Sequence, residues 1–311
     1  MQSQRLGNAE ARVVKELISV VSDPTILKLI SSCPMAGVFR DGLLEGKTAF
    51  VTGGGTGIGL GMAKRFAEHG AKVMLTGRRK EVLENARAEI EAAGGIAGTA
   101  PLDVRDYAAQ ESALKRTRDE FGSIDIVLAA AAGNFPAPVL GMSANGFKAV
   151  IDIDLLGTFN TMRAAHQFLR KPGASLLAVS AAHATSPIPF QSHVCAAKAA
   201  IEILMKTIAL EWSAEGIRAN CITPGPTADT EGMRRLAPTP ELENDVKSTA
   251  PLHRFGTRDE LADLALYLCT DAAAYITGAT FFCDGGTSLL KSGTLMGEVW
   301  KNHLNSRSSR D

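Results

Sequence analysis

Short apolar runs alternate with longer amphipathic stretches between residues 47 and 290 of this chain. The apolar runs predict strands, and the stretches between them carry apolar residues at helical spacing. The predicted strands are Thr48–Thr52, Lys72–Thr76, Gly98–Leu102, Ile124–Ala129, Ser175–Ser180, Arg218–Thr223 and Thr280–Cys283. The predicted helices include Leu60–His69, Glu81–Ala93, Tyr107–Phe121 and a long run from Ala144 to Leu169.

Continuous apolar strands separated by helices are typical of a parallel sheet that is covered on both faces. Because such crossovers are right-handed, a doubly wound sheet is the main topology left open. We therefore predict an α/β protein with a Rossmann-like, doubly wound, seven-stranded parallel sheet, helices on both faces and a single domain. Residues 43–290 would form this domain, between an N-terminal helical extension, 1–42, and a polar C-terminal tail, 291–311.

The charge and the cysteines of the chain exclude several classes of protein. The 311 residues contain 33 Lys plus Arg and 33 Asp plus Glu, so no net charge points to nucleic acid or to a membrane surface. The five cysteines are scattered without metal-ligand spacing, which favours reduced thiols over disulfides and predicts no metal site. They are Cys33, Cys195, Cys221, Cys269 and Cys283.

No targeting signal is evident, and the expected location is cytoplasmic. No apolar run approaches the roughly 20 residues that a membrane-spanning helix needs. The N-terminus lacks a basic start with an apolar core, and Glu10, Glu16 and Asp23 are atypical of a transit peptide. The last four residues, Ser308 to Asp311, do not match a peroxisomal Ser-Lys-Leu signal.

A glycine-rich turn, Thr-Gly-Gly-Gly-Thr-Gly-Ile-Gly, follows the first predicted strand and leads into a helix. In such a turn Gly53 permits the sharp bend, Gly57 lets the backbone approach a pyrophosphate, and Gly59 allows close helix packing. The helix that begins after Thr56 and Ile58 offers free amides and a positive dipole end to phosphates. The turn therefore predicts a dinucleotide-binding site.

The end of the second strand predicts which dinucleotide is bound. Sheets that bind NAD usually carry an acidic residue there to hold the ribose hydroxyls. Here the strand ends in Gly77, Arg78, Arg79 and Lys80, so the acid is absent. Because the Arg78 guanidinium can donate two hydrogen bonds to a 2′-phosphate, NADP(H) is the predicted cofactor, with Arg79 beside it. The alternative is a solvated basic turn.

The glycine-rich turn and the downstream Lys198 together resemble the short-chain dehydrogenase/reductase family, over about 43–290. The family's catalytic tyrosine, four residues before its lysine, is replaced here by Val194, and its serine by Ala181. Enoyl-carrier-protein reductases place the tyrosine seven residues before the lysine, where this chain has Gln191. Ketone reduction by the family's usual mechanism is therefore not expected.

The resemblance implies further cofactor contacts. Residues after the third strand match the family's adenine contact, a segment after the fourth strand matches the adenosine-ribose contact, and a Pro-Gly turn matches the nicotinamide contact. Lys198 would bind the nicotinamide ribose. The additional residues implied are Asp103, Val104, Ala132, Gly133, Pro224, Gly225 and Thr227.

Within the family, the segment 131–135, Ala-Ala-Gly-Asn-Phe, is similar to a signature of 2,4-dienoyl-CoA reductases, which serve the oxidation of unsaturated fatty acids. The match is to the peroxisomal type, because the mitochondrial type has a tyrosine where this chain has His183. The resemblance implies a catalytic Asp154 and Lys198 in place of Tyr and Lys, an acyl-CoA substrate and a homotetramer. The implied substrate contacts are Arg105, Asn134, Phe135, His193 and Arg235.

The chemistry of this branch explains why a tyrosine is dispensable. Hydride adds to the far end of a conjugated dienoyl thioester, so the protein must stabilise an enolate and then protonate carbon. An ordered water held by Asp154 is the expected proton source, although His183 and His193 fall near the same cleft and Asp154 alone could be a helix-pairing residue. Rival interpretations are another conjugated acyl-CoA or a steroid-type substrate, and a catalytically silent NADP-binding scaffold.

Overall fold

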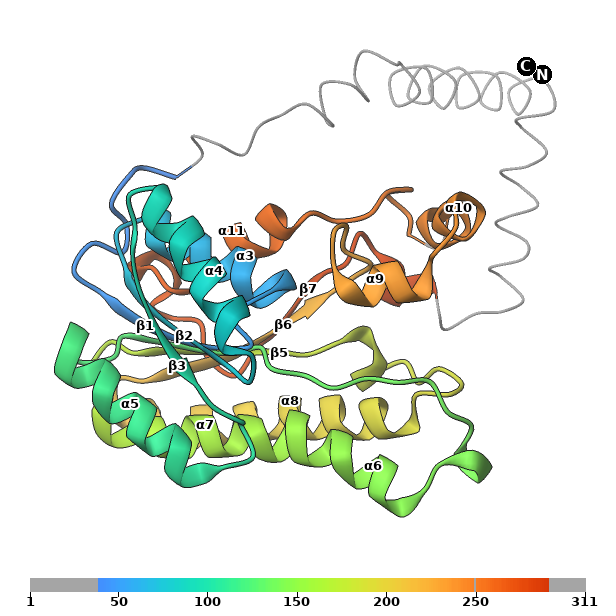
Figure 1. Cartoon of the computed structure of the whole chain (residues 1–311), viewed down its shortest axis with the longest axis horizontal. Coiled ribbons are helices and arrows are strands. Elements are labelled where there is room, and N and C mark those ends of the chain that lie inside the picture. The colour runs from blue at the N-terminus through green and yellow to red at the C-terminus, as the bar shows by residue number, and fades with distance from the viewer. Residues whose placement is uncertain (1–38, 249, 291–311) are drawn as a thin grey trace, which may run out of the picture. The chain divides into compact units, whose positions relative to one another are not determined.

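The computed structural model describes residues 39–248 and 250–290 (Figure 1). Its sheet has seven parallel strands in the order β3-β2-β1-β4-β5-β6-β7. The strands are β1 Thr48–Thr52, β2 Lys72–Gly77, β3 Ile96–Pro101, β4 Ile126–Ala129, β5 Ser175–Val179, β6 Arg218–Pro224 and β7 Thr280–Cys283. Almost all of the predicted extension, 1–42, and the whole tail, 291–311, lie outside the described residues.

The chain reverses its direction of sheet growth at β1. Thr48 of β1 pairs with Lys72 of β2 on one side, and Ala49 of β1 pairs with Ile126 of β4 on the other. Adjacent crossovers from β1 and β4 therefore leave the sheet in opposite directions, which opens a crevice at the carboxyl ends of these strands. The predicted doubly wound fold is confirmed.

Helices cover both faces of the sheet, with α5, α7 and α8 on one face and α3, α4 and α11 on the other (Figure 1). None of the helices in the described part of the chain has the length and hydropathy needed to cross a bilayer. The α-helices are α3 Gly57–Glu68, α4 Lys80–Ala92, α5 Tyr107–Phe121, α6 Ala144–Val150, α7 Gly157–Ala165, α8 Ser192–Trp212, α9 Glu231–Leu236, α10 Pro240–Ser248, α11 Arg258–Leu268 and α12 Thr287–Leu290.

Local sequence explains where several helices begin. The side chain of Asp106 accepts a hydrogen bond from the backbone N–H of Ala109 and caps α5. Thr257 and Glu260 form a reciprocal capping box at the start of α11. Each cap satisfies amide groups that the helix itself leaves unpaired, and such caps stabilise a helix by about 1 kcal/mol.

The long predicted helix from Ala144 to Leu169 is helical almost throughout but is not regular. Between α6 and α7 the residues Ile151–Leu156 form a π-helical segment, and His166–Phe168 end the run as a 3₁₀ turn. A π turn has one extra residue, which the spacing of apolar residues cannot reveal. The widened turn contains Asp154.

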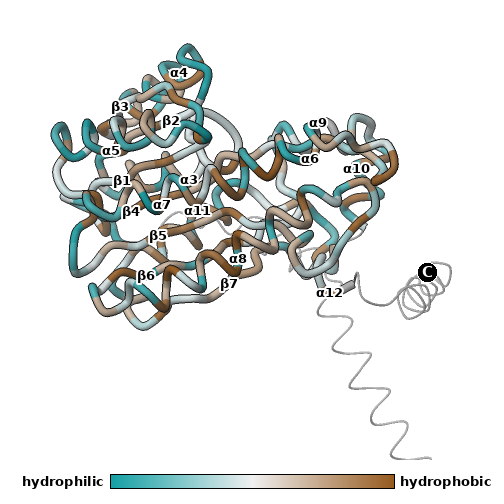
Figure 2. The backbone as a smooth tube through the Cα atoms, turned by 90° about the horizontal axis from the view of Figure 1, so that it is seen from below, coloured by the Kyte–Doolittle hydropathy of each residue, from teal (hydrophilic) through white to brown (hydrophobic). Residues whose placement is uncertain are grey.

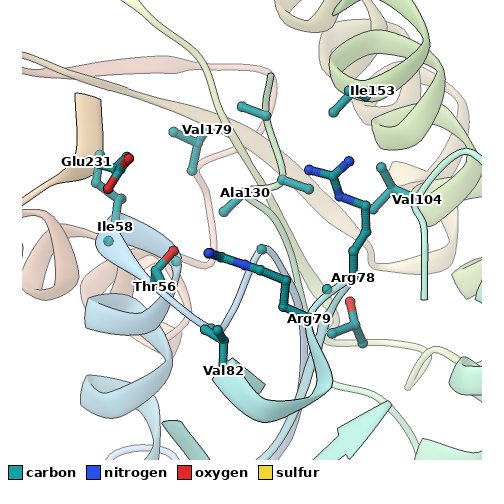
Figure 3. A pocket seen from close by; sticks show the side chains of 18 of the residues that line it. Thr56, Ile58, Arg78, Arg79, Val82, Val104, Ala130, Ile153, Val179 and Glu231 are labelled. Carbon is teal, nitrogen blue, oxygen red and sulfur yellow. The ribbon is translucent and has the colours of Figure 1, made fainter. Parts of the chain in front are cut away.

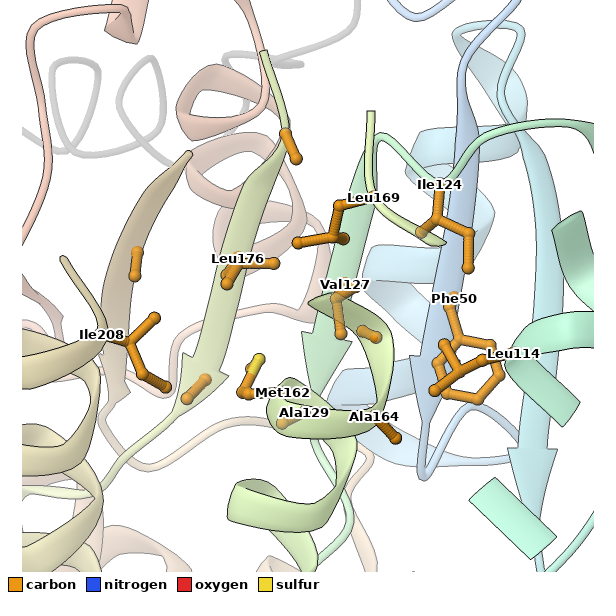
Figure 4. Packing of buried hydrophobic residues seen from close by; sticks show 14 of the residues in the cluster. Phe50, Leu114, Ile124, Val127, Ala129, Met162, Ala164, Leu169, Leu176 and Ile208 are labelled. Carbon is orange, nitrogen blue, oxygen red and sulfur yellow. The ribbon is translucent and has the colours of Figure 1, made fainter. Parts of the chain in front are cut away.

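The core lies between the sheet and its helices (Figure 4). All five residues of β1 are buried, and Phe50 packs in one cluster with Val127 and Leu176 of neighbouring strands and with Leu114 and Met162 of the covering helices. Burying each such side chain contributes about 1.5–3 kcal/mol. Figure 2 shows the hydropathy along the chain, with hydrophobic residues along β5 and α8 and hydrophilic residues on the outer turns of α4 and α5.

Asp125 joins the start of β4 to the start of β1, and we expect its removal to destabilise the fold. Its carboxylate is 2% exposed, accepts a hydrogen bond of 2.9 Å from the Thr48 N–H and pairs with Arg170. Asp125→Ala should lower the free energy of unfolding by about 2–4 kcal/mol, because a buried N–H and a guanidinium lose their partner. Urea unfolding measures the change.

Asp119→Ala is the matched control, because Asp119 is an exposed carboxylate on α5 whose ion-pair partners among the described residues, Lys115 and Arg118, belong to the same helix. We expect no measurable loss of stability there. Equal effects of the two substitutions would contradict the role given to Asp125.

Candidate active site

A pocket of about 460 Å³ opens at the carboxyl ends of the strands (Figure 3). It is lined by the glycine-rich turn, by the end of β2, and by residues that follow β3, β4, β5 and β6. Predicted cofactor residues in its wall are Gly53, Thr56, Gly57, Ile58, Gly59, Arg78, Arg79, Asp103, Val104, Ala132, Lys198 and Pro224. Residues as far apart in the sequence as Gly53 and Pro224 therefore meet at the crevice that the strand order creates.

The glycine-rich turn has no room for side chains at its critical positions. A Cβ on Gly53 would lie 2.8 Å from the backbone of Ala130, and a Cβ on Gly59 would lie 2.5 Å from the Gly53 carbonyl oxygen. Gly57 has a φ of +58°, which L side chains rarely adopt. The turn thus brings bare backbone and the first amides of α3 to the pocket, which is the arrangement that binds a pyrophosphate.

Arg78 and Arg79 extend from the end of β2 into the pocket (Figure 3). Neither guanidinium forms an ion pair with another residue of the described ranges, whereas Arg105, Arg116 and Arg118 do. Two unneutralised guanidinium groups beside a glycine-rich turn fit a phosphate group that supplies their counter-charge. Among the described residues, the end of β2 carries no carboxylate that would bind the ribose hydroxyls of a cofactor without a 2′-phosphate. The pocket wall therefore fits an NADP-type cofactor.

The carboxylate of Asp103 is neutralised by Arg105. Arg105 Nε lies 2.9 Å from Asp103 Oδ1, and its Nη2 lies 2.6 Å from Oδ2. These hydrogen bonds lower the pKa of Asp103 to about 2, so the group is ionised at neutral pH. Asp103 lines the cofactor pocket, so the structure places Arg105 at the rim of that pocket, and its predicted contact with substrate stays a prediction.

The two predicted catalytic residues lie together. Asp154 is fully buried in the π-helical segment, and its Oδ2 is 3.1 Å from Lys198 Nζ on α8. Its Oδ1 accepts a hydrogen bond of 2.7 Å from the Gly133 N–H. Lys198 also donates to the Val179 carbonyl at 3.0 Å. A buried charge is tolerated when it is paired and hydrogen-bonded in this way.

Only one member of this pair faces the pocket. Lys198 lines it, whereas Asp154 stands behind, with its backbone carbonyl accepting a hydrogen bond from the Thr158 hydroxyl at 2.6 Å. Asp154 thereby fixes both the ammonium of Lys198 and the loop at Gly133. The arrangement can hold a positive charge at the pocket wall, where it stabilises negative charge that develops on a substrate.

His193 is a buried histidine in the first turn of α8. Its exposed fraction is 0%, and neither ring nitrogen has a hydrogen-bond partner among the described residues. Its ring meets that of Phe135 edge-on, with centroids 4.6 Å apart. Phe135 and Asn134 are exposed on the loop that follows β4. His183 lies in a 3₁₀ turn after β5.

Several predicted site residues shape the pocket without lining it. A Cβ on Gly225 would lie 2.6 Å from Asp284 Cα, so this glycine allows two chain segments to meet. The hydroxyl of Thr227, which is 3% exposed, donates to the Gly225 carbonyl at 2.9 Å. The amide of Gly133 is bound to Asp154. The Arg235 side chain lies outside the described part of the chain.

Sequence reasoning missed part of the pocket wall. Ile153 precedes Asp154 in the π-helical segment, Val179 ends β5 and Ser180 follows it, and residues 230–232 form the N-cap and the start of α9. The strand-end residues had a usable signal, because the carboxyl ends of parallel strands share one edge of the sheet. Ile153 had none, because its orientation depends on the π turn.

Val194 occupies the tyrosine position of the family, and a tyrosine there should not restore ketone reduction. The side chain is 5% exposed and packs with Val150, Ala197 and Ile151. Val194→Tyr would overfill this contact and would still lack the serine hydroxyl that Ala181 replaces. Reduction of simple ketones by the variant should stay below detection in an NADPH absorbance assay. A ketone reduction rate above that of the wild type would contradict this.

The cysteines in the described part of the chain form no disulfide, and none of them belongs to a group of side chains that could bind a metal ion. Burial raises the pKa of Cys221 and of Cys269 to about 12, so both are neutral thiols at physiological pH. Cys195 and Cys283 are partly buried. Within 39–248 and 250–290 no three His, Cys, Asp or Glu side chains are placed to hold a metal ion.

Comparison with known proteins adds a family to this geometry. A family model described as Enoyl-(Acyl carrier protein) reductase matches residues 53–288. A peroxisomal 2,4-dienoyl-CoA reductase of Arabidopsis thaliana, named as (3E)-enoyl-CoA-producing, is 38% identical over 86% of this chain and 93% of its own length. The Saccharomyces cerevisiae protein of the same name is 41% identical over 80% of this chain and 87% of its own length. A probable 2,4-dienoyl-CoA reductase of Bacillus subtilis, named as (2E)-enoyl-CoA-producing, is 39% identical over 78% of this chain and 97% of its own length.

Solved structures agree in fold. A dehydrogenase/reductase from Sinorhizobium meliloti has a TM-score of 0.74 and 32% identity, and the match covers 79% of this chain and 97% of that one. A gluconate 5-dehydrogenase from Burkholderia cenocepacia, in complex with NADP and tartrate, has a TM-score of 0.75 and 28% identity. That match covers 80% of this chain and 98% of the other.

Proposed function

This chain belongs to the short-chain dehydrogenase/reductase family of oxidoreductases, and we propose that it reduces 2,4-dienoyl-CoA thioesters with NADPH in the oxidation of unsaturated fatty acids. The observation that carries the proposal is the buried Asp154–Lys198 pair, at a pocket whose tyrosine and serine positions hold Val194 and Ala181. The relatives named 2,4-dienoyl-CoA reductase support the reaction.

The preference for NADPH rests on Arg78 and Arg79. Both line the pocket and lack a described ion-pair partner, so a 2′-phosphate supplies the charge that they would otherwise leave uncompensated. Asp103 and Val104 line the same pocket and would hold the adenine, and the Gly53–Gly59 turn would bind the pyrophosphate. The bound cofactor supplies hydride to the far carbon of the dienoyl group.

Lys198 provides charge where the substrate needs it. The ammonium group is held between Asp154 and the Val179 carbonyl, so it does not reorient when negative charge develops. A fixed cation at the pocket wall lowers the energy of a dienolate whose charge reaches the thioester oxygen. It also provides a donor for the ribose hydroxyls of the cofactor, as in the resembled reductases.

Proton delivery to carbon is assigned to the Asp154–Lys198 pair acting through a water. Oδ2 of Asp154 has no partner among the described residues other than the Lys198 ammonium, so the carboxylate holds the ammonium in place and the water would bind to the ammonium at the pocket wall. His193 is the second candidate, because its ring nitrogens are buried and unpartnered. The acyl chain and thioester would contact Asn134, Phe135 and His193, and the coenzyme A phosphates would contact Arg105 and Arg235.

We assign the (3E)-enoyl product that the Arabidopsis and yeast relatives carry in their names. In that outcome hydride adds to C5 of the substrate and the proton adds to C2, beside the thioester. Protonation at C4 would give the (2E) product named for the Bacillus relative. A donor next to the thioester therefore decides the product, and Lys198 with its water is placed in that role.

The assembly and the location are also proposals. Exposed apolar residues on α7 and α8, namely Phe159, Ile203 and Leu210, support a homotetramer built through these helices, with Phe282 of β7 at a second contact. The reductase domain is proposed to span 43–290. A cytoplasmic location competes with a peroxisomal one, since several relatives are peroxisomal by name. Fluorescence microscopy of the tagged chain beside a peroxisomal marker separates the two.

The test is loss of NADPH absorbance with 2,4-decadienoyl-CoA, followed by NMR of the product. Turnover with NADPH to the (3E)-enoyl thioester supports the proposal. Turnover only with another conjugated acyl-CoA or with a steroid-derived thioester would change the substrate. Tight NADPH binding without turnover of any conjugated thioester would make the chain a binding scaffold and would overturn the proposal.

A further inference from the structure

Glu202 is a buried carboxylate that the proposed reaction does not use. It lies on α8, one turn after Lys198, and is 7% exposed. It forms no ion pair with another described residue, and the Ser180 hydroxyl donates a hydrogen bond of 2.7 Å to its Oε1. Burying a carboxylate is costly, so an acid retained here beside the pocket calls for a physical reason.

Ser180, the partner of Glu202, lies in the pocket wall directly after β5. Ser180 is 2% exposed, lines the pocket and follows the last residue of β5. Its backbone N–H donates to the Ile222 carbonyl of β6 at 2.8 Å. The preceding carbonyl, that of Val179, accepts the hydrogen bond from Lys198.

One helix therefore holds the end of β5 at two adjacent residues. Lys198 binds the carbonyl of Val179, and Glu202, one turn later, binds the side chain of Ser180. Because residues four apart lie on one face of a helix, the two contacts form a closed link between α8 and β5. The contact between Glu202 and Ser180 fixes the orientation of the Val179 carbonyl, and the hydrogen bond from Lys198 depends on that orientation.

We propose that Glu202 is a positioning residue that acts through Ser180 to set the place and the charge environment of Lys198. The inference rests on the proposed function, since Lys198 is there the charged group that faces substrate. The charged groups around Glu202 are Lys198 and the exposed Lys206 on its own helix, and Asp154 beyond Lys198. Cys221 of β6 is also close, and burial keeps it a neutral thiol. The buried set therefore contains two carboxyl groups, those of Asp154 and Glu202, and one amino group, that of Lys198.

The test variant is Glu202→Gln in the full-length protein with NADPH and 2,4-decadienoyl-CoA. Glutamine keeps the size of the side chain and an oxygen that accepts from Ser180, and it removes the charge. A nearby negative charge disfavours loss of the proton from a donor, so its removal should move the alkaline limb of the kcat–pH profile down by about 0.5 unit or more. KM for the thioester should stay within about twofold.

Ser180→Ala tests the link itself. It should lower kcat by about tenfold, the order of one lost hydrogen bond to a charged group. The double variant with Glu202→Gln should be no slower than Ser180→Ala, because both changes act on one contact. Glu211→Gln, an exposed residue of α8, is the matched control and should leave the profile unchanged.

Two outcomes would overturn the inference while leaving the proposed function intact. One is that the wild type is active and a folded Glu202→Gln variant has the same kcat–pH profile as the wild type. The other is a double variant whose losses add. An inactive wild type instead removes the proposed function, and the two failures are therefore distinct.

Discussion

Asp154→Asn is expected to lower kcat on a 2,4-dienoyl-CoA by about 10²–10⁴-fold, the range usual for loss of a general acid. Asparagine keeps an oxygen that accepts the Gly133 N–H, so the loop after β4 stays in place. It removes the negative charge 3.1 Å from Lys198, which holds the ammonium and, through it, the proposed water. Steady-state kinetics with NADPH and 2,4-decadienoyl-CoA measure the loss.

NADPH affinity separates the two members of the pair. Asp154 does not line the pocket, so Asp154→Asn should change the Kd for NADPH little, whereas Lys198→Ala should weaken binding and also lower turnover. Asp152→Asn is the matched control on the same π-helical segment, because its carboxylate pairs with Lys148 at the surface, and kcat should remain within about twofold. Near-normal turnover in a folded Asp154→Asn variant would move the search for the proton donor to His183 and His193.

Arg78→Asp is expected to reduce the preference for NADPH over NADH by 100-fold or more. The substitution removes a charged hydrogen-bonding contact and adds repulsion of the 2′-phosphate, together about 3 kcal/mol. The new carboxylate can accept the ribose hydroxyls of NADH, so part of the change is a gain with NADH. The ratio of kcat/KM for the two cofactors measures it.

Arg87→Asp makes the same change of charge on α4, away from the pocket, where Arg87 pairs with Glu84 and Glu91. Its cofactor ratio should match that of the wild type. An unaltered ratio in Arg78→Asp would show that the phosphate is held elsewhere, with Arg79 the next residue to replace.

The fold was predictable because its signals are local. Strands β1 and β7 have the predicted bounds, Thr48–Thr52 and Thr280–Cys283, since each is a short apolar run with clear limits. Alternation of such runs with helices admits few topologies other than a doubly wound parallel sheet. The glycine turn was equally readable, because Gly53 and Gly59 stand where a Cβ has no space.

The site was only partly predictable. Lys198 and Asp154 were named through a family resemblance, since a carboxylate within an apolar helix is no signal of a partner 44 residues away. Arg105 was expected to contact substrate, and the structure pairs it with Asp103. Sequence alone could not locate that pair, because two oppositely charged residues two positions apart can pair or separate according to the turn between them.

The sequence by itself determined the class of fold, the dinucleotide turn, the basic end of β2 and the loss of the usual tyrosine and serine. These depend on residue type at a position or on spacing along one element. Only the tertiary structure decided that Lys198 faces the pocket, that Asp154 stands behind it and that Glu202 holds Ser180. The reason is geometric: a π turn rotates every side chain within it, and contacts between α8 and β5 exist only once the crossover has packed α8 against the sheet.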